Sequence, residues 1–250
     1  MENRAMKKKT RQSLIRRCRV SVAKQRVLFS LFCAGATARA SARAAGVNRN
    51  TAARIFRVFR LLIALSRLSL APFSGRVEID ECYLRGGNGG RKVARQGRCN
   101  AGKFVVVGAA QRCPETGTRR LKTAVIPQAN RETLHAFARE HVSPGSEINT
   151  DQFKAYKLNK CGYVHKRVNH SLVFKNFRNG ACTNIIESAW SVMRRHLNRF
   201  CGGYRHNLRL FLAEIEMRFE CGVQTFEKAF RKLLRNCNRA KTFDSFRAVG

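Results

Sequence analysis

Acidic residues are scarce in this chain of 250 residues, which has 15 Asp and Glu against 50 Lys and Arg and a formal net charge of +35. Between Glu2 and Glu78 no carboxylate side chain occurs at all. So large a positive charge destabilises a compact fold unless a polyanion neutralises it. Arg outnumbers Lys by 35 to 15, and the planar guanidinium suits bidentate contacts to phosphates and guanines. The charge therefore predicts nucleic acid as the partner.

Long apolar runs are also missing. The longest candidate, Val27 to Ala34, is far shorter than the ~20 residues of a membrane span. The basic segments also lack the bulky apolar face with which an amphipathic helix enters lipid, so a membrane partner is disfavoured. The charged start, Met1 to Lys9, has no apolar segment behind it, as a secretory signal would. We expect a soluble protein, cytoplasmic and nucleoid-associated in a bacterium or nuclear in a eukaryote.

Glycine and proline are also few, and the cysteines form no typical metal-binding pair. Gly and Pro number only 18 and 4 while 44% of the residues are hydrophobic, which excludes a collagen-like or mostly disordered chain. None of the ten cysteines forms a C-x-x-C pair, which argues against a zinc ribbon. Cys161, His165 and Cys182 have no diagnostic metal-ligand spacing, so free and mostly buried thiols are expected.

Three short helical patterns precede residue 70. The first ends at Gly35, the second runs from Thr37 to Ala45, and the third begins at Asn48 or Asn50. This pattern is typical of a helix-turn-helix whose last helix enters the major groove of DNA. An ordinary helical bundle with a solvated basic face is the alternative. The apolar stripe of the third helix is Ala52, Ile55, Phe56, Phe59, Leu62 and Ile63, and its predicted DNA-contacting face is Arg49, Asn50, Thr51, Arg54 and Arg57.

After a predicted linker at residues 70–75, the periodicity changes to that of an α/β fold. Strands are predicted over residues 76–84, 104–110, 121–126, 147–149 and 163–168, and helices over 130–141, 183–200, 207–220 and 224–237. This order predicts a mixed sheet with helices packed on it. The predicted domains are a basic helix-turn-helix domain at 1–70, a catalytic α/β domain at 71–222 and a C-terminal helical extension at 223–250.

Three carboxylates lie at positions where catalytic or metal-binding groups are expected. Asp80 lies within an apolar strand, Asp151 follows a short strand, and Glu187 lies on a helix that is otherwise short of acids. Three carboxylates from separate elements can hold two divalent ions for phosphodiester cleavage. The residue pattern alone leaves alternatives open, because Glu78 and Glu81 flank Asp80 and pairing with Arg would explain any single acid.

Several motifs then occur in a fixed order: VEIDECY, the Gly- and Arg-rich stretch LRGGNGGRKVARQGR, AGKFVVVGAAQR, INTD, VNHS, TNIIESAW and RRHL. Together, over about residues 24–221, they resemble the DDE transposases of a bacterial insertion-sequence group, the ISXO-like type, and their relatives, the Merlin elements. The resemblance implies an RNase-H-like catalytic domain after the helix-turn-helix domain. It matches the family's three acids to Asp80, Asp151 and Glu187, with 70 and 35 residues between them.

The resemblance also implies roles. Two Mg²⁺ or Mn²⁺ ions would be held by the three acids, with Asp80 bridging both ions and Asp151 and Glu187 each holding one. Water would attack the phosphodiester at the transposon end, and the freed 3′-hydroxyl would attack target DNA without a covalent enzyme intermediate. Arg194, seven residues after Glu187, matches a basic residue of the family and would steady a phosphate.

Further DNA contacts are expected from two other segments. Arg91, Lys92, Arg95 and Arg98 of the Gly-rich loop would grip the backbone, with a plain mobile hairpin as the alternative. Asn169 and His170 match an Asn-His pair of the family, although a hydrogen-bonded core histidine is the alternative for His170. Many relatives have His where this chain has Cys182. Trp190 is expected to lie in the core.

The expected function is that of an insertion-sequence transposase that acts on terminal inverted repeats and target DNA as a homo-oligomer. A non-catalytic or domesticated DNA-binding protein derived from a transposase is the alternative. A general nuclease or RNase H of the same fold is a third hypothesis, but a sequence-indifferent nuclease has little use for a helix-turn-helix.

Overall fold

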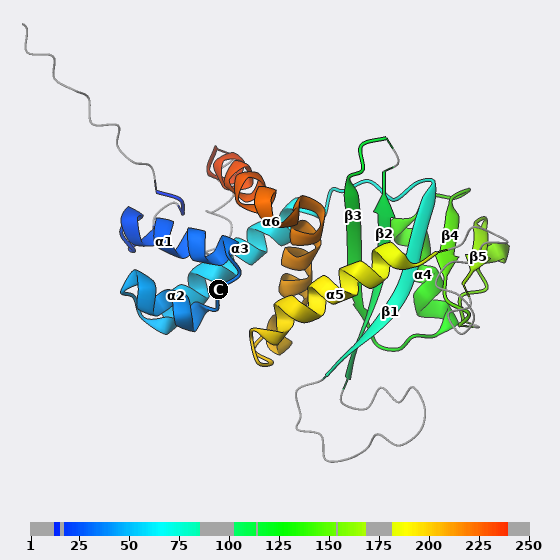
Figure 1. The fold of residues 1–250 in the computed structure, drawn as a ribbon, viewed down its shortest axis with the longest axis horizontal. Coiled ribbons are helices and arrows are strands. Elements are labelled where there is room, and N and C mark those ends of the chain that lie inside the picture. The colour runs from blue at the N-terminus through cyan, green and yellow to red at the C-terminus, as the bar shows by residue number, and fades with distance from the viewer. Residues whose placement is uncertain are drawn as a thin grey trace, which may run out of the picture. The chain divides into compact units, whose positions relative to one another are not determined.

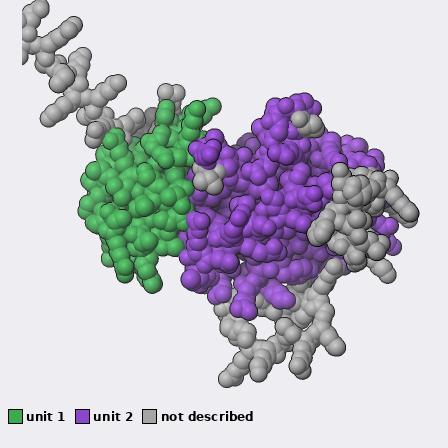
Figure 2. All heavy atoms as spheres, in the orientation of Figure 1, with its two compact units in different colours: residues 1–62, 227–250 green, residues 63–226 purple. Residues whose placement is uncertain are grey.

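The computed structural model describes residues 13–15, 18–85, 103–113, 115–153, 155–168 and 182–239. The chain divides into two compact units: residues 1–62 with 227–250, and residues 63–226 (Figure 2). We call them unit 1 and unit 2. Within the described ranges, no helix is both long and apolar enough to span a membrane.

Unit 1 contains α1 (Val22–Cys33), α2 (Ala38–Ala45) and most of α3 (Arg49–Ser66). Each helix start has a hydrogen-bonding cap, of which the sequence predicts the third. The side chains of Ser21 and Thr37 accept from the amides of Lys24 and Ala40, and Asn48 Oδ1 accepts from the amide of Asn50. Gly46 ends α2 with a left-handed backbone (φ 59°), which glycine adopts at little cost.

The core of unit 1 is a cluster of phenylalanines. The predicted apolar stripe of α3 is buried in full. Phe230, from the last part of α6 (Leu208–Arg239), lies 5.4 to 5.5 Å between ring centroids from Phe29, Phe32 and Phe59. The residues after 226 therefore complete the core of unit 1. The sequence-based division had set residues 223–250 apart as an extension.

Unit 2 is built on a five-stranded sheet with the strand order β3-β2-β1-β4-β5. The strands are β1 (Arg76–Arg85), β2 (Lys103–Arg112), β3 (Arg119–Ile126), β4 (Glu147–Thr150) and β5 (Val164–Arg167). The first three strands are antiparallel, whereas β4 runs parallel to β1 and β5 parallel to β4. All five strands coincide closely with the predicted ones, and the mixed sheet confirms the α/β, RNase-H-like class.

Helices cover both faces of this sheet (Figure 1). On one face, α5 (Asn184–Asn198) and the first part of α6 pack against Cys82, Leu84 and Val106. On the other face, α4 (Arg131–His141) packs against Val77, Ile79 and Val107. Side chains alternate along a strand, so even-numbered residues of β1 point toward α5 and odd-numbered ones toward α4. Phe73, inside the predicted linker, is buried and bonded to the carbonyl of His141.

The nine described cysteines are free. This confirms the expected free thiols for these residues. Only Cys82 is buried and Cys201 is exposed, while the other seven are half-buried, so the expectation of mostly buried thiols is wrong.

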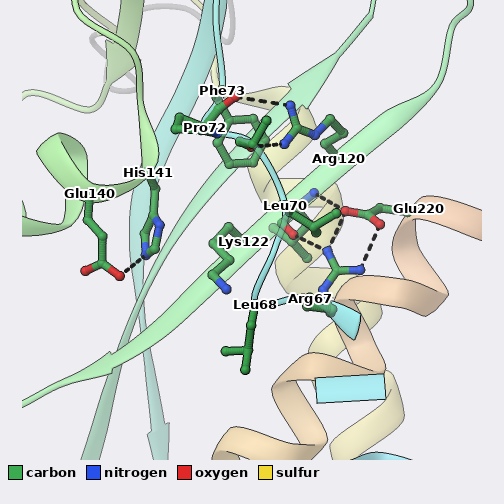
Figure 3. A pocket seen from close by; sticks show the side chains of 12 residues that line it. Arg67, Leu68, Leu70, Pro72, Phe73, Arg120, Lys122, Glu140, His141 and Glu220 are labelled. Carbon is green, nitrogen blue, oxygen red and sulfur yellow. Dashed lines mark hydrogen bonds and ion pairs between the residues drawn. The ribbon is translucent and has the colours of Figure 1, made fainter. Parts of the chain in front are cut away.

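Strand β3 lies at an edge of the sheet, and carboxylates from α6 cap it. Glu216 Oε1 accepts from the amide of Thr123 at 2.7 Å, and Glu220 Oε1 accepts from the amide of Leu121 at 3.0 Å. Arg67 donates to the carbonyl of Leu121 and bridges both carboxylates, at 2.5 Å to Glu216 and 2.6 Å to Glu220. Figure 3 shows Arg67 and Glu220 in the wall of the adjoining pocket. Side chains thus satisfy backbone groups with which another strand would otherwise pair.

We expect Arg67→Met to destabilise unit 2 by about 3–5 kcal/mol, because it leaves the buried carboxylate of Glu216 without its cation. Urea unfolding measures this. Lys166→Met is the matched control, since its ion pair with Glu147 is partly exposed and should cost less than about 1 kcal/mol. Equal losses in the two variants would contradict the role assigned to Arg67.

Candidate active site

Asp80 lies at the middle of β1, on the face that α5 covers. Its neighbour across the ladder on β2 is Gly108. The indole Nε1–H of Trp190, on α5, donates to Asp80 Oδ2 at 2.9 Å. A Cβ atom at Gly108 would lie 2.5 Å from Cη2 of Trp190, so glycine is needed there for the indole to reach the carboxylate.

Asp151 comes directly after β4, the parallel neighbour of β1. Glu78 pairs with Asn149 in that ladder, and continuing the register by two residues brings Asp151 level with Asp80 on the same face. Asp151 Oδ1 accepts from the amide of Phe153 at 2.8 Å, a turn that fixes the carboxylate just beyond the strand.

Glu187 lies in the first turn of α5 and its side chain is exposed. Thr183, the residue before the helix, donates its hydroxyl to Glu187 Oε1 at 3.0 Å. Asn184, Glu187, Ser191 and Arg194 recur at intervals of three or four residues and form an exposed face of this helix.

The pKa of Asp80 depends on both of the other acids. Burial raises the pKa of Asp80 above its ordinary value, and the charges of Asp151 and Glu187 raise it further. The hydrogen bonds from Trp190 and from the amide of Glu81 act in the opposite direction. Asp151 and Glu187 thus act on Asp80 through their charges. Carboxylates supply the hard oxygen donors that a divalent cation prefers.

The residues therefore fit a divalent cation by their chemistry. Within the described ranges, no three His, Cys, Asp or Glu side chains already lie in a metal-holding arrangement. The two ions expected from the sequence stay a prediction.

The glutamates that flank Asp80 have other partners. Glu78 is buried and accepts hydrogen bonds from the amides of Ile185 and Ile186 at the start of α5. Burial raises the pKa of Glu78, against the lowering effect of these amides and of the Cys182 thiol. Glu81 accepts from the Tyr156 hydroxyl at 2.7 Å. Both carboxylates are thus engaged with the elements that flank the site.

Arg194 lies along α5 from Glu187 and reaches β1. Its Nη2 donates to Cys82 Sγ at 3.3 Å, two residues along the strand from Asp80. Burial raises the pKa of Cys82, while the Arg194 charge lowers it. The exposed Arg194 side chain is therefore held against β1, two residues from Asp80, and its action on a phosphate stays a prediction.

The other predicted DNA contacts fall in two groups. On α3, in unit 1, Arg49, Asn50, Arg54 and Arg57 are exposed and Thr51 is half-buried. The loop residues and the Asn-His pair lie outside the described residues: Arg91, Lys92, Arg95, Arg98, Asn169 and His170. DNA binding by either group stays a prediction.

Sequence reasoning missed three groups that shape the site. Trp190 is a core residue, as expected, but it also binds Asp80 directly. Gly108, an isolated glycine in an apolar strand, was the available signal for a close approach. His165 bonds to Thr150, next to Asp151, and burial lowers its pKa from 6.5 to about 4.

Comparison with known proteins places this domain in a family. The model of the ISXO2-like transposase domain matches residues 72–220. The chain is also 36% identical, over 101 residues, to an uncharacterized transposase-like protein of Haemophilus influenzae, covering 40% of this chain and 80% of that protein. The RNase-H-like fold of unit 2 is thus that of a transposase domain. The chain belongs to the ISXO2-like transposase family, which confirms the resemblance found in the sequence.

We expect Asp80→Asn to stabilise the metal-free protein at pH 7. The raised pKa of Asp80 means that its ionised form opposes folding. The penalty is absent below the ordinary pKa, where the group is protonated in both states, and grows as pH rises through the folded-state pKa. The asparagine oxygen still accepts from Trp190. Urea unfolding in EDTA from pH 4 to 8 measures the gain, with the exposed Glu132→Gln as control. A variant less stable than wild type at pH 7 would contradict this account.

Proposed function

We propose that this protein is a DNA transposase that cleaves the ends of a mobile element and transfers the freed strand to target DNA. The observation that carries the proposal is that Asp151 and Glu187 lie close enough to Asp80 for their charges to raise its pKa, in a transposase-family domain. The three acids come from β1, from the end of β4 and from α5, so the fold has to be complete before they meet.

Asp80, whose pKa responds to the charges of both other acids, would be the ligand shared by two Mg²⁺ or Mn²⁺ ions, and Asp151 and Glu187 would each hold one. Such ions activate the attacking oxygen and stabilise the leaving oxygen of a phosphodiester. Trp190 holds Asp80 Oδ2 in place through its N–H. This hydrogen bond fixes the orientation of the Asp80 carboxylate.

The chemistry balances without a covalent enzyme intermediate. Water adds to phosphorus at the element's end and the 3′-oxygen leaves with a proton as a free hydroxyl. That hydroxyl then attacks a target phosphodiester, one P–O bond forming as another breaks. Arg194 would steady the phosphate, because its cation is fixed beside β1.

Unit 1 would supply recognition of the DNA ends. The exposed face of α3 carries four basic or amide side chains and no acid. No acidic residue occurs anywhere between Glu2 and Glu78. A helix of this kind after a short turn suits the major groove. Bringing two ends together requires two active sites, so we propose at least a dimer on DNA.

The test is nicking of a supercoiled plasmid that carries the repeats flanking the gene, with Mg²⁺ or with EDTA, at one fixed salt concentration. We expect Mg²⁺-dependent cleavage at the repeats, lost by at least about 100-fold in Asp80→Asn, Asp151→Asn and Glu187→Gln, because each variant removes a charged metal ligand. Binding of the repeats must persist in all three variants.

The other outcomes decide between the alternatives. Binding without cleavage by the wild type would favour a non-catalytic DNA-binding protein. Cleavage indifferent to the repeats would favour a general nuclease, and cleavage that survives all three substitutions would mean that other acids act.

A further inference from the structure

We propose that Glu78 and Glu81, which flank Asp80 on β1, are positioning residues for the other two acids. Glu78 would hold the helix that carries Glu187, and Glu81 would hold the segment that carries Asp151. The inference rests on the proposed function for its effect on catalysis, but its structural part concerns contacts that exist without metal or DNA.

Glu78 joins β1 to the start of α5. It is 2% exposed, and its Oε2 accepts from the amides of Ile185 and Ile186 at 2.7 and 3.0 Å. Its Oε1 accepts from the Cys182 thiol at 3.2 Å. The first amides of a helix have no partner within the helix and carry partial positive charge, so a buried carboxylate binds them well. Glu187 follows Ile186 directly and is fixed by the same contact.

Glu81 points to the opposite face and joins β1 to the segment after β4. The Tyr156 hydroxyl donates to Glu81 Oε2 at 2.7 Å, and Tyr156 is completely buried. The backbone of Tyr156 bonds to the carbonyl of Phe153, whose own amide donates to Asp151 Oδ1 at 2.8 Å. A short chain of hydrogen bonds therefore connects Glu81 to Asp151.

Both links start from the strand that carries Asp80. Glu78 lies two residues before it and Glu81 one residue after it, so each is rigidly placed relative to the first acid. A misplacement of 1 Å in a catalytic group can cost about 100-fold in rate. The positions of Asp151 and Glu187 would thus be set from one strand, through two contacts on opposite faces of the sheet.

The test compares variants that remove each link with variants that keep its hydrogen bonds. Glu78→Leu removes the acceptors, whereas Glu78→Gln keeps an oxygen for both amides and places an NH₂ group opposite the Cys182 sulfur. Glu81→Leu and Tyr156→Phe break the second link, whereas Glu81→Gln still accepts from the Tyr156 hydroxyl. Glu132→Gln, on the exposed side of α4, is the control.

Hydrogen exchange, measured by mass spectrometry on the metal-free chain, gives a readout independent of activity. We expect Glu78→Leu to speed exchange at residues 184–187 by roughly tenfold or more, the loss expected for a hydrogen bond to a charged group. Exchange at 151–156 should stay unchanged. Glu81→Leu and Tyr156→Phe should do the reverse, and both glutamine variants and the control should match the wild type. Equal exchange in wild type and both leucine variants would overturn the proposal.

Cleavage kinetics on end DNA then separate positioning from folding. Among variants that unfold cooperatively, we expect kcat to fall roughly 100-fold in Glu78→Leu and at least tenfold in Tyr156→Phe, with KM for DNA nearly unchanged. The glutamine variants should stay within a few-fold of wild type. Leucine variants as active as wild type would overturn the proposal even where cleavage is confirmed. An inactive wild type would count against the proposed function alone, and hydrogen exchange would then decide the positioning.

Discussion

The close packing of α5 on the sheet at Gly108 is the constraint on which the rest of the site depends. A methyl group there would lie 2.5 Å from the Trp190 ring and 3.1 Å from Ile186. Only without a side chain at that position can the indole N–H reach Asp80 and the first amides of α5 reach Glu78. The absence of a side chain at Gly108 thus allows α5 to contact two carboxylates of β1, those of Asp80 and Glu78.

The acids packed under α5 also lower the stability of the metal-free protein. Asp80 is half-buried, and its desolvation and the charges of Asp151 and Glu187 disfavour its ionised form. A ligand that binds only the folded state stabilises it by an amount that grows with the logarithm of its concentration over Kd. The charges at Asp80 therefore weaken the folded protein, and under the proposed function a bound cation would offset this cost. Paired groups elsewhere, such as Arg67 with Glu216 and Glu220, stabilise the sheet edge.

Much of the fold follows from periodicity. The alternating pattern of β1 and the apolar stripe of α3 were visible in the sequence because each depends on neighbouring residues. The contacts that join distant segments were not. Arg67 meets Glu216 across 149 positions, and Phe230 enters a core formed otherwise by the first 62 residues. In the site, the residue pattern singled out the three acids but left alternatives open, and the motif resemblance matched these three to the acids of the family. The partners of Glu78 and Glu81 depend on the register of β1 and the start of α5, which the sequence does not show.

The central claim is that Asp80, Asp151 and Glu187 form one divalent-cation site. Anomalous X-ray scattering from crystals of the full chain grown with Mn²⁺ tests it most directly. The account predicts two Mn²⁺ peaks, both bound by Asp80, with one also bound by Asp151 and the other by Glu187. Mn²⁺ bound at other residues, or no Mn²⁺ at these three carboxylates at saturating concentration, would contradict it.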